Sequence, residues 1–175
     1  MDPKSIKQAI DAAVDYLTKN PDEAKYTDSV ATARRSSPDG LAFDVSGPNG
    51  AWMSTDMPTS VGGANNGPSP GWYLRAAEAS CVATLIAMRA AQLEVTLDEL
   101  EVTVDSESND FGILGIGDEV PAGPLSTRVH VRIGSSATTD DAQLRGIVDW
   151  AVKHCPVTDA VSRAIPLHVE IQTGL

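Results

Sequence analysis

The stretch that decides the fold of this chain is Trp72-Tyr-Leu-Arg-Ala-Ala-Glu-Ala-Ser-Cys-Val-Ala-Thr-Leu-Ile-Ala-Met-Arg-Ala-Ala-Gln-Leu93. Apolar residues recur on nearly every face of this uninterrupted helical pattern, which predicts a long helix that is buried on most sides. Its many alanines allow neighbouring elements to approach closely. The preceding stretch over 61–71 is rich in Gly, Asn and Pro, and it predicts a loop of the kind that often carries a binding feature.

The segments on either side of this helix predict an α+β fold. In chain order we expect a helix over 5–19, a hairpin over 25–46 with its turn at 36–40, a third strand over 51–57, the long helix over 72–93, a strand over 100–106, a Gly-rich irregular insert over 108–123, a strand over 125–134, a helix over 139–153, a short helix ending near 163 and a final strand over 166–172. Strands and helices do not alternate strictly, so we expect helices on one face of a mainly antiparallel sheet.

The composition is that of one globular unit. The chain has 175 residues, of which 42% are hydrophobic and 21% charged. We expect an N-terminal helical extension over 1–24 and a single domain over 25–175. The formal net charge of −11 argues against nucleic acid and anionic membranes as partners, because both require clustered Lys and Arg. No stretch predicts a transmembrane segment or a signal-peptide core, so we expect a cytoplasmic protein.

The two cysteines lie in different local settings. A cysteine pair in a cytoplasmic protein is more often redox-active, metal-binding or unrelated than a structural disulfide. Pro156 suits the first position of a helix, which predicts that Cys155 is the N-cap of the short helix that follows. A helix N-terminus stabilises a thiolate and lowers the thiol pKa. The alternative is a capping cysteine without chemistry.

Cys81 lies within the long helix, and two charged residues precede it at helical spacing. Arg75, Glu78 and Cys81 follow one another at intervals of three residues, so charge can lie close to the thiol on one stripe. An arginine there would stabilise the thiolate, and the glutamate would hold the arginine. The alternative is a buried cysteine that acts only as a small core residue.

Other kinds of site lack their sequence patterns. The two cysteines and three histidines show no CxxC or HxxxH spacing, so we expect no metal. No GxSxG motif supports a hydrolase triad. The glycines over 112–117 are not followed by a predicted helix, which argues against a phosphate loop. We therefore expect a protein without a cofactor.

Two stretches together resemble the OsmC/Ohr family, the osmotically inducible and organic hydroperoxide resistance proteins. They are Gly67-Pro-Ser-Pro-Gly-Trp-Tyr-Leu-Arg-Ala-Ala-Glu-Ala-Ser-Cys81 and, much later, His154-Cys-Pro-Val157. The resemblance covers about residues 25–172. It implies an α+β fold in which mainly antiparallel sheets pack around long central cysteine-bearing helices. It also implies an intertwined homodimer with two active sites at the interface.

The resemblance further implies a thiol peroxidase. Cys81 would be the peroxidatic cysteine, whose thiolate attacks the O–O bond of an organic hydroperoxide or of hydrogen peroxide and becomes a sulfenic acid. Cys155 would be the resolving cysteine, which forms a disulfide with Cys81 that an external dithiol reduces.

The sequence departs from the family at the residues that activate the thiolate. Active members carry an Arg from the first hairpin and a Glu near the start of the cysteine helix. The hairpin offers Arg34 and Arg35, of which we expect Arg35 to act because it is nearer the turn. Gly71 stands at the position of the family's Glu, and Glu78 is the expected substitute. A non-catalytic dimeric module that binds a small apolar ligand is the alternative function, supported by this missing Glu and by the apolar, Ala-rich helix.

Overall fold

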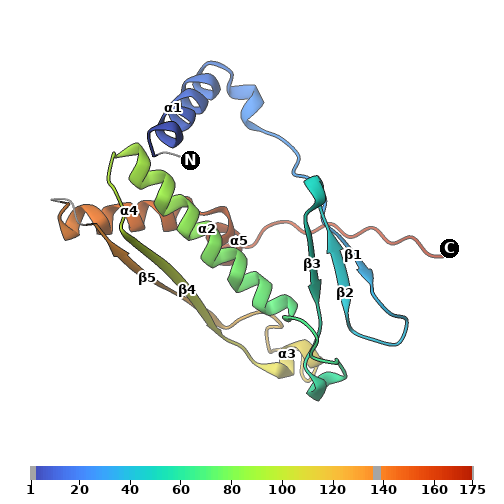
Figure 1. Ribbon diagram of the computed structural model, residues 1–175. Helices are drawn as coiled ribbons and strands as arrows, with labels where there is room; N and C mark the ends of the chain where they lie inside the picture. The colour runs from blue at the N-terminus through green and yellow to red at the C-terminus, as the bar shows by residue number, and fades with distance from the viewer. Residues whose placement is uncertain (1–2, 136–138, 175) are drawn as a thin grey trace.

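The computed structural model describes residues 3–135 and 139–174. Its helices and strands follow one another as α1 (Pro3–Lys19), β1 (Thr32–Arg35), β2 (Phe43–Ser46), β3 (Trp52–Thr55), α2 (Pro70–Gln92), β4 (Glu99–Glu107), α3 (Asp110–Leu114), β5 (Ser126–Gly134), α4 (Asp141–His154) and α5 (Pro156–Ser162) (Figure 1). Short 3-10 turns lie at Pro21–Ala24, Pro48–Gly50 and Thr59–Val61. The predicted α+β fold with antiparallel strands is confirmed. The strands form two sheets instead of one, residues 25–31 of the predicted hairpin form no strand, and the insert and the C-terminal segment differ as described below.

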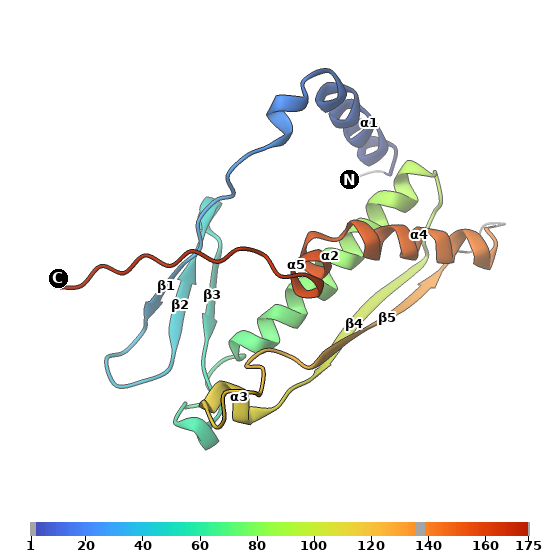
Figure 2. The same cartoon turned by 180° about the vertical axis from the view of Figure 1, so that it is seen from behind.

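The strands form two separate antiparallel sheets. β1, β2 and β3 pair in that order, and the register places Arg34 opposite Asp44 and Arg35 opposite Phe43. β4 and β5 pair over their whole length, with Val102 opposite Val131. The three-stranded sheet lies to one side of α2, whereas β4 and β5 lie against the other side of that helix (Figures 1 and 2).

The hydrophobic core lies where α2 meets α4, α5 and one face of the β4–β5 sheet. Val82 and Ile86 of α2 and Ile147 and Ala151 of α4 are completely buried. Alternation along the strands turns one set of side chains towards this core: Leu100, Val102, Val129, Val131 and Ile133. Charged residues take the opposite set of strand positions, where Arg128 pairs with Asp105 and Arg132 with Glu99.

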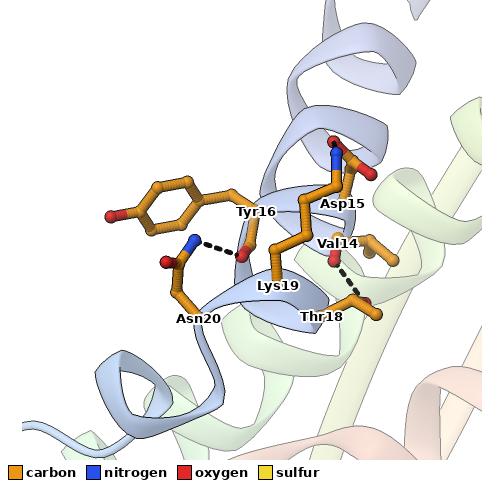
Figure 3. A network of polar contacts seen from close by, with 6 residues as sticks. All are labelled: Val14, Asp15, Tyr16, Thr18, Lys19 and Asn20. Atoms are coloured by element: carbon orange, nitrogen blue, oxygen red, sulfur yellow. Dashed lines mark hydrogen bonds and ion pairs between the residues drawn. The ribbon is translucent and has the colours of Figure 1, made fainter.

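Helix α1 packs on α2 through one side only. Ile6 and Ile10 are half-buried, whereas Val14 and Leu17 near its end are exposed. Figure 3 shows how the helix ends: the Asn20 side-chain amide donates to the Tyr16 carbonyl at 2.8 Å. That bond satisfies one of the carbonyl groups that a helix leaves without a partner at its C-terminal end.

The predicted final strand over 166–172 is wrong for the single chain. Residues 164–174 form no strand or helix and run as an extended tail from α5 in the direction of the three-stranded sheet (Figure 2). The alternating pattern that predicted a strand is present, but Leu167 is 85% exposed and Ile171 is 83% exposed. A strand needs a neighbour for its backbone groups, and the tail has no paired strand among residues 3–135 and 139–174.

The insert over 108–123 differs from the prediction because it contains a short helix, α3. The Asn109 side chain accepts the Phe111 N–H at 3.0 Å and so caps α3. Gly112 is needed because a Cβ there would lie 2.1 Å from the Pro121 carbonyl oxygen. No helix in the described part of the chain is both long and apolar enough to cross a membrane.

Candidate functional site: a cysteine pair between two helices

Helix α2 carries the first cysteine of the site. It begins with Ser69 as N-cap, whose side chain accepts the Trp72 N–H at 3.2 Å, and with Pro70 at its first position. Cys81 lies near the middle of this 23-residue helix and is half-buried. A thiol on so long and well-packed a helix has a fixed position in the fold.

The second cysteine lies at the junction of α4 and α5. Cys155 is completely buried, and its thiol accepts the Thr158 N–H at 3.4 Å. The prediction that Cys155 is the N-cap of the short helix is therefore confirmed. The neighbouring His154 is engaged elsewhere, because its ring stacks on Trp150 with 4.3 Å between the ring centroids.

The fold brings the two thiols together, although they are far apart in the sequence. α5 packs against α2 (Figure 1). The Cys81 side chain packs against the buried cluster that contains Cys155, close enough for each thiol to shift the pKa of the other. Both cysteines are free thiols. Two thiols that lie close together are candidates for oxidation to a disulfide.

The two thiols differ in acidity. Burial raises the pKa of Cys81, the adjacent Cys155 thiol raises it further, and the Val157 amide opposes both. Burial also acts to raise the pKa of Cys155, but the hydroxyl and amide of Thr158, the Cys81 thiol and the Val157 amide outweigh it and lower the pKa. The surroundings of Cys155 therefore favour its thiolate, whereas those of Cys81 favour its thiol.

Glu78 reaches the site through Thr158. The Glu78 side chain is 1% exposed, and its Oε1 accepts the Thr158 hydroxyl at 3.3 Å. Arg75 turns to another part of the fold, because its Nη1 donates to Ser106 of β4 at 3.2 Å. The expected contact between Glu78 and Arg75 is thus replaced by one between Glu78 and α5.

The hairpin arginines lie apart from the thiols of the same chain. Arg34 and Arg35 are exposed on β1, and Arg35 donates to the Pro38 carbonyl within the hairpin turn at 2.9 Å. The sheet that carries them lies apart from α5 (Figures 1 and 2). No group of three or more His, Cys, Asp or Glu side chains that could hold a metal ion occurs in residues 3–135 and 139–174.

Residues 63–170 match the model of the OsmC-like protein family. The chain belongs to the OsmC-like family. A search of curated proteins finds no significant match. Among solved structures, the chain is similar to an organic hydroperoxide resistance protein OsmC from Legionella pneumophila, with 18% identity, a TM-score of 0.60, and coverage of 78% of this chain and 90% of that one.

Two further structures give the same result. An OsmC-like protein from Mycoplasma pneumoniae has 16% identity and a TM-score of 0.61, over 79% of this chain and 88% of that one. The organic hydroperoxide resistance protein OhrB of Bacillus subtilis has 19% identity and a TM-score of 0.51, over 77% and 90%. At identities this low, the structural similarity establishes the OsmC-like fold alone. The activity has to be argued from the site.

Gly71, where the resemblance places a glutamate, lines a recess at the start of α2. The recess has a volume of about 270 Å³, and its walls include Met57, Leu74, Arg75 and Ile113. Helix geometry separates Gly71 from Cys81 by about 15 Å along the axis of α2. A glutamate at this position would therefore not contact Cys81 of the same OsmC-like chain.

Sequence reasoning missed two residues of this region. Thr158 is one, and the signal was its position three residues after an N-capping cysteine, where a backbone N–H turns back to the cap. Asp56 is the other: its buried carboxylate accepts the N–H groups of Met57, Ala64 and Asn66 at 2.7, 3.2 and 3.0 Å. These bonds fix the loop that leads into α2. The signal in the sequence was a single aspartate beside a Gly- and Asn-rich stretch, where such a side chain readily accepts backbone N–H groups.

Proposed function

We propose that this OsmC-like chain is a cysteine-based peroxidase that reduces organic hydroperoxides or hydrogen peroxide. The observation that carries the proposal is the proximity of two free thiols from distant parts of the chain, one of which caps a helix. The family supports it, because relatives of the same fold are named for organic hydroperoxide resistance.

The proposed reaction has three steps. The Cys81 thiolate attacks one peroxide oxygen and the O–O bond breaks, which leaves Cys81 as a sulfenic acid. The leaving group is an alkoxide from an organic hydroperoxide or hydroxide from hydrogen peroxide, and it takes up a proton to become an alcohol or water. The Cys155 thiolate then attacks the Cys81 sulfur, the S–O bond breaks, and hydroxide leaves and takes up a proton to form water. An external dithiol reduces the resulting disulfide and is itself oxidised to a disulfide.

Cys81 is proposed as the peroxidatic residue because it is the more accessible thiol. Cys81 is half-buried, whereas Cys155 is 0% exposed and cannot meet a peroxide without movement of α5. The lower pKa of Cys155 suits the second step, in which a thiolate must attack a neighbouring sulfenic acid. We propose Arg35 as the cation that activates Cys81, with Glu78 in a supporting role.

We also propose that the active form is an intertwined homodimer. Trp52 of the three-stranded sheet is 67% exposed, and Leu167 and Ile171 of the tail are more exposed still. Helix α2 leaves a stripe of small residues uncovered at Ala77, Ser80, Thr84 and Ala87, which suits the close approach of a second helix. A second copy would cover these surfaces and could bring the hairpin of one chain to Cys81 of the other.

Replacement of each cysteine tests the assigned roles. With dithiothreitol as the dithiol, Cys81→Ser should abolish peroxide consumption, because the attacking sulfur is lost. Without added dithiol, Cys155→Ser should still consume one equivalent of peroxide per chain and leave Cys81 as a sulfenic acid, which dimedone traps for mass spectrometry. If the two variants behave alike in a single turnover, the roles of Cys81 and Cys155 are wrong.

A non-catalytic module that binds a small apolar ligand is the second candidate. It is favoured by the recess at the start of α2, where Gly71 replaces the family's glutamate and Met57, Leu74 and Ile113 provide apolar walls. An unchanged content of free thiols after a stoichiometric dose of cumene hydroperoxide would favour this function over the peroxidase.

A further inference from the structure

Thr158 connects the two cysteine-bearing helices through two different atoms. Its backbone N–H donates to the Cys155 thiol at 3.4 Å, and its hydroxyl donates to Glu78 Oε1 at 3.3 Å. Glu78 precedes Cys81 by three residues, so both side chains project from neighbouring turns of α2. Thr158 therefore ties the start of α5, where Cys155 lies, to α2 at a position three residues before Cys81.

Helix α5 depends on such a contact for its position. It has only seven residues, none of them buried, and an exposed tail follows it. Val157 adds apolar contact with the core. An isolated helix of this length is unstable in water, so its orientation must come from its contacts with α2 and α4.

Glu78 is a specific anchor for this purpose. Its carboxyl group is buried in the face of α2 towards α5, and within residues 3–135 and 139–174 it has no ion pair with Lys, Arg or His. A buried carboxyl group that loses a hydrogen-bond partner is strongly penalised, so the bond to Thr158 favours one seating of α5 on α2.

We propose that the bond between Thr158 and Glu78 is a latch that positions Cys155 for the resolving step. The inference rests on the proposed peroxidase and adds a positioning residue to it. The latch acts on the second reaction, in which Cys81–SOH and Cys155–SH give the Cys81–Cys155 disulfide and one water. The first reaction uses the Glu78 side chain and the Val157 amide but not the Thr158 hydroxyl, so the latch acts mainly on the second reaction.

Rapid-mixing kinetics on Thr158→Val and Thr158→Ser test the latch. Valine keeps the size and branching of the side chain but removes the hydroxyl, so disulfide formation should slow about ten-fold, the effect of losing one hydrogen bond to a carboxylate. Sulfenic acid formation should change less than about two-fold, since it does not need this bond. Trapping with dimedone separates the two steps, and Thr158→Ser should restore the wild-type rate.

The matched control is Ser162→Ala, at the other end of α5, where the hydroxyl donates only to the Asp159 carbonyl at 3.2 Å. This variant should form the disulfide at the wild-type rate. Far-ultraviolet circular dichroism of each variant shows that the helices are retained. A wild-type rate of disulfide formation in Thr158→Val, or a lack of rescue in Thr158→Ser, would overturn the latch.

A second measurement separates failure of the latch from failure of the peroxidase. In glutathione redox buffers the Cys81–Cys155 disulfide forms by thiol exchange without any peroxide. There the effective concentration of one thiol at the other should fall about ten-fold in Thr158→Val and remain unchanged in Thr158→Ser and Ser162→Ala. This result would support the latch even if the wild-type chain reduced no peroxide, and equal effective concentrations in all four proteins would refute it.

Discussion

The two halves of the molecule differ in how much of their apolar surface they bury. In the body formed by α2, β4, β5, α4 and α5, Val82, Ile86, Ile147 and Ala151 are completely buried. In the three-stranded sheet and the tail, Trp52 and Leu167 are 67% and 85% exposed. Within the described residues, the body thus has a hydrophobic core, whereas the sheet and the tail contribute no residue to one.

This difference separates the two requirements of the proposed reaction. Both thiols lie in the body, so one chain is sufficient to bring them together. Arg35 lies in the sheet, so the cation proposed to activate Cys81 belongs to the half that needs another surface to cover it. We infer that the disulfide depends on one chain and that fast reaction with peroxide depends on two.

Removal of the tail should have the largest effect, because it should change the oligomeric state of the protein. A chain that ends at Ala164 should be monomeric, because the exposed apolar side chains of the tail are lost as a contact surface. Light scattering at micromolar concentration should give twice the chain mass of 18.4 kDa for the intact protein and the mass of a single chain for the truncated one.

His168→Ala is the matched control for the tail. It changes a side chain between Leu167 and Val169 on the opposite side of an extended segment, and it should leave the dimer intact. The account would be contradicted by an intact chain that is monomeric or by a truncated chain that remains a dimer.

Replacement of the hairpin arginines should have the next largest effect. Arg35→Ala should raise the pKa of Cys81 and slow its reaction with peroxide at neutral pH about ten-fold, because a nearby cation stabilises the thiolate. Arg34→Ala should change both quantities less, because successive residues of a strand point to opposite faces. The measurement is the pH dependence of Cys81 alkylation in a Cys155→Ser background.

The same experiment shows whether the sheet of a second copy supplies the cation. The effect of Arg35→Ala should disappear in the chain that ends at Ala164, which lacks the proposed dimer contact. An unchanged alkylation profile for both arginine variants in the full chain would exclude the hairpin as the source of the cation.

Asp56 offers the smallest and most local test, at the junction between the sheet and α2. Backbone N–H donors, Asn66 first, outweigh burial and hold the pKa of Asp56 below the ordinary value of 3.8. Because the folded pKa is the lower one, the stabilising contribution is fully present above pH 3.8 and is lost as the pH falls through the folded pKa. Asp56→Asn should therefore lower the urea midpoint at pH 7.

The pH dependence distinguishes this effect from a general loss of packing. The difference in urea midpoint between the wild type and Asp56→Asn should shrink as the pH falls below 3.8. Asp44→Asn, on the exposed side of β2, is the control and should leave the midpoint at pH 7 nearly unchanged. A difference that is equal at neutral and acidic pH would show that the carboxylate itself does not fix the loop.

The sequence predicted the body of the fold better than its edges. The apolar pattern over 72–93 and the strict alternation over 125–134 each have one structural interpretation, and α2 and β5 match them. The alternation over 166–172 also predicted a strand, but the structure has an extended tail there. A strand depends on a partner edge, and a sequence pattern does not show whether that edge belongs to the same chain.

The candidate site was predicted only in part, because a sequence shows local backbone preferences but not contacts between distant segments. Pro156 predicted that Cys155 is an N-cap, because this preference arises from local backbone geometry. The contact between Glu78 and Thr158 was not predicted, because it joins helices that are far apart in the chain. Spacing along one helix had suggested Arg75 as the partner of Glu78, but Arg75 donates to Ser106 across the body instead.

The central claim is that Cys81 and Cys155 form a disulfide during the reduction of a peroxide. The most direct measurement is a titration of free thiols, with intact-mass spectrometry, before and after a stoichiometric dose of cumene hydroperoxide. The account predicts that both thiols disappear, that the chain loses the mass of two hydrogens, and that dithiothreitol restores both. Unchanged thiols, or a chain that gains oxygen without forming the Cys81–Cys155 bond, would contradict it.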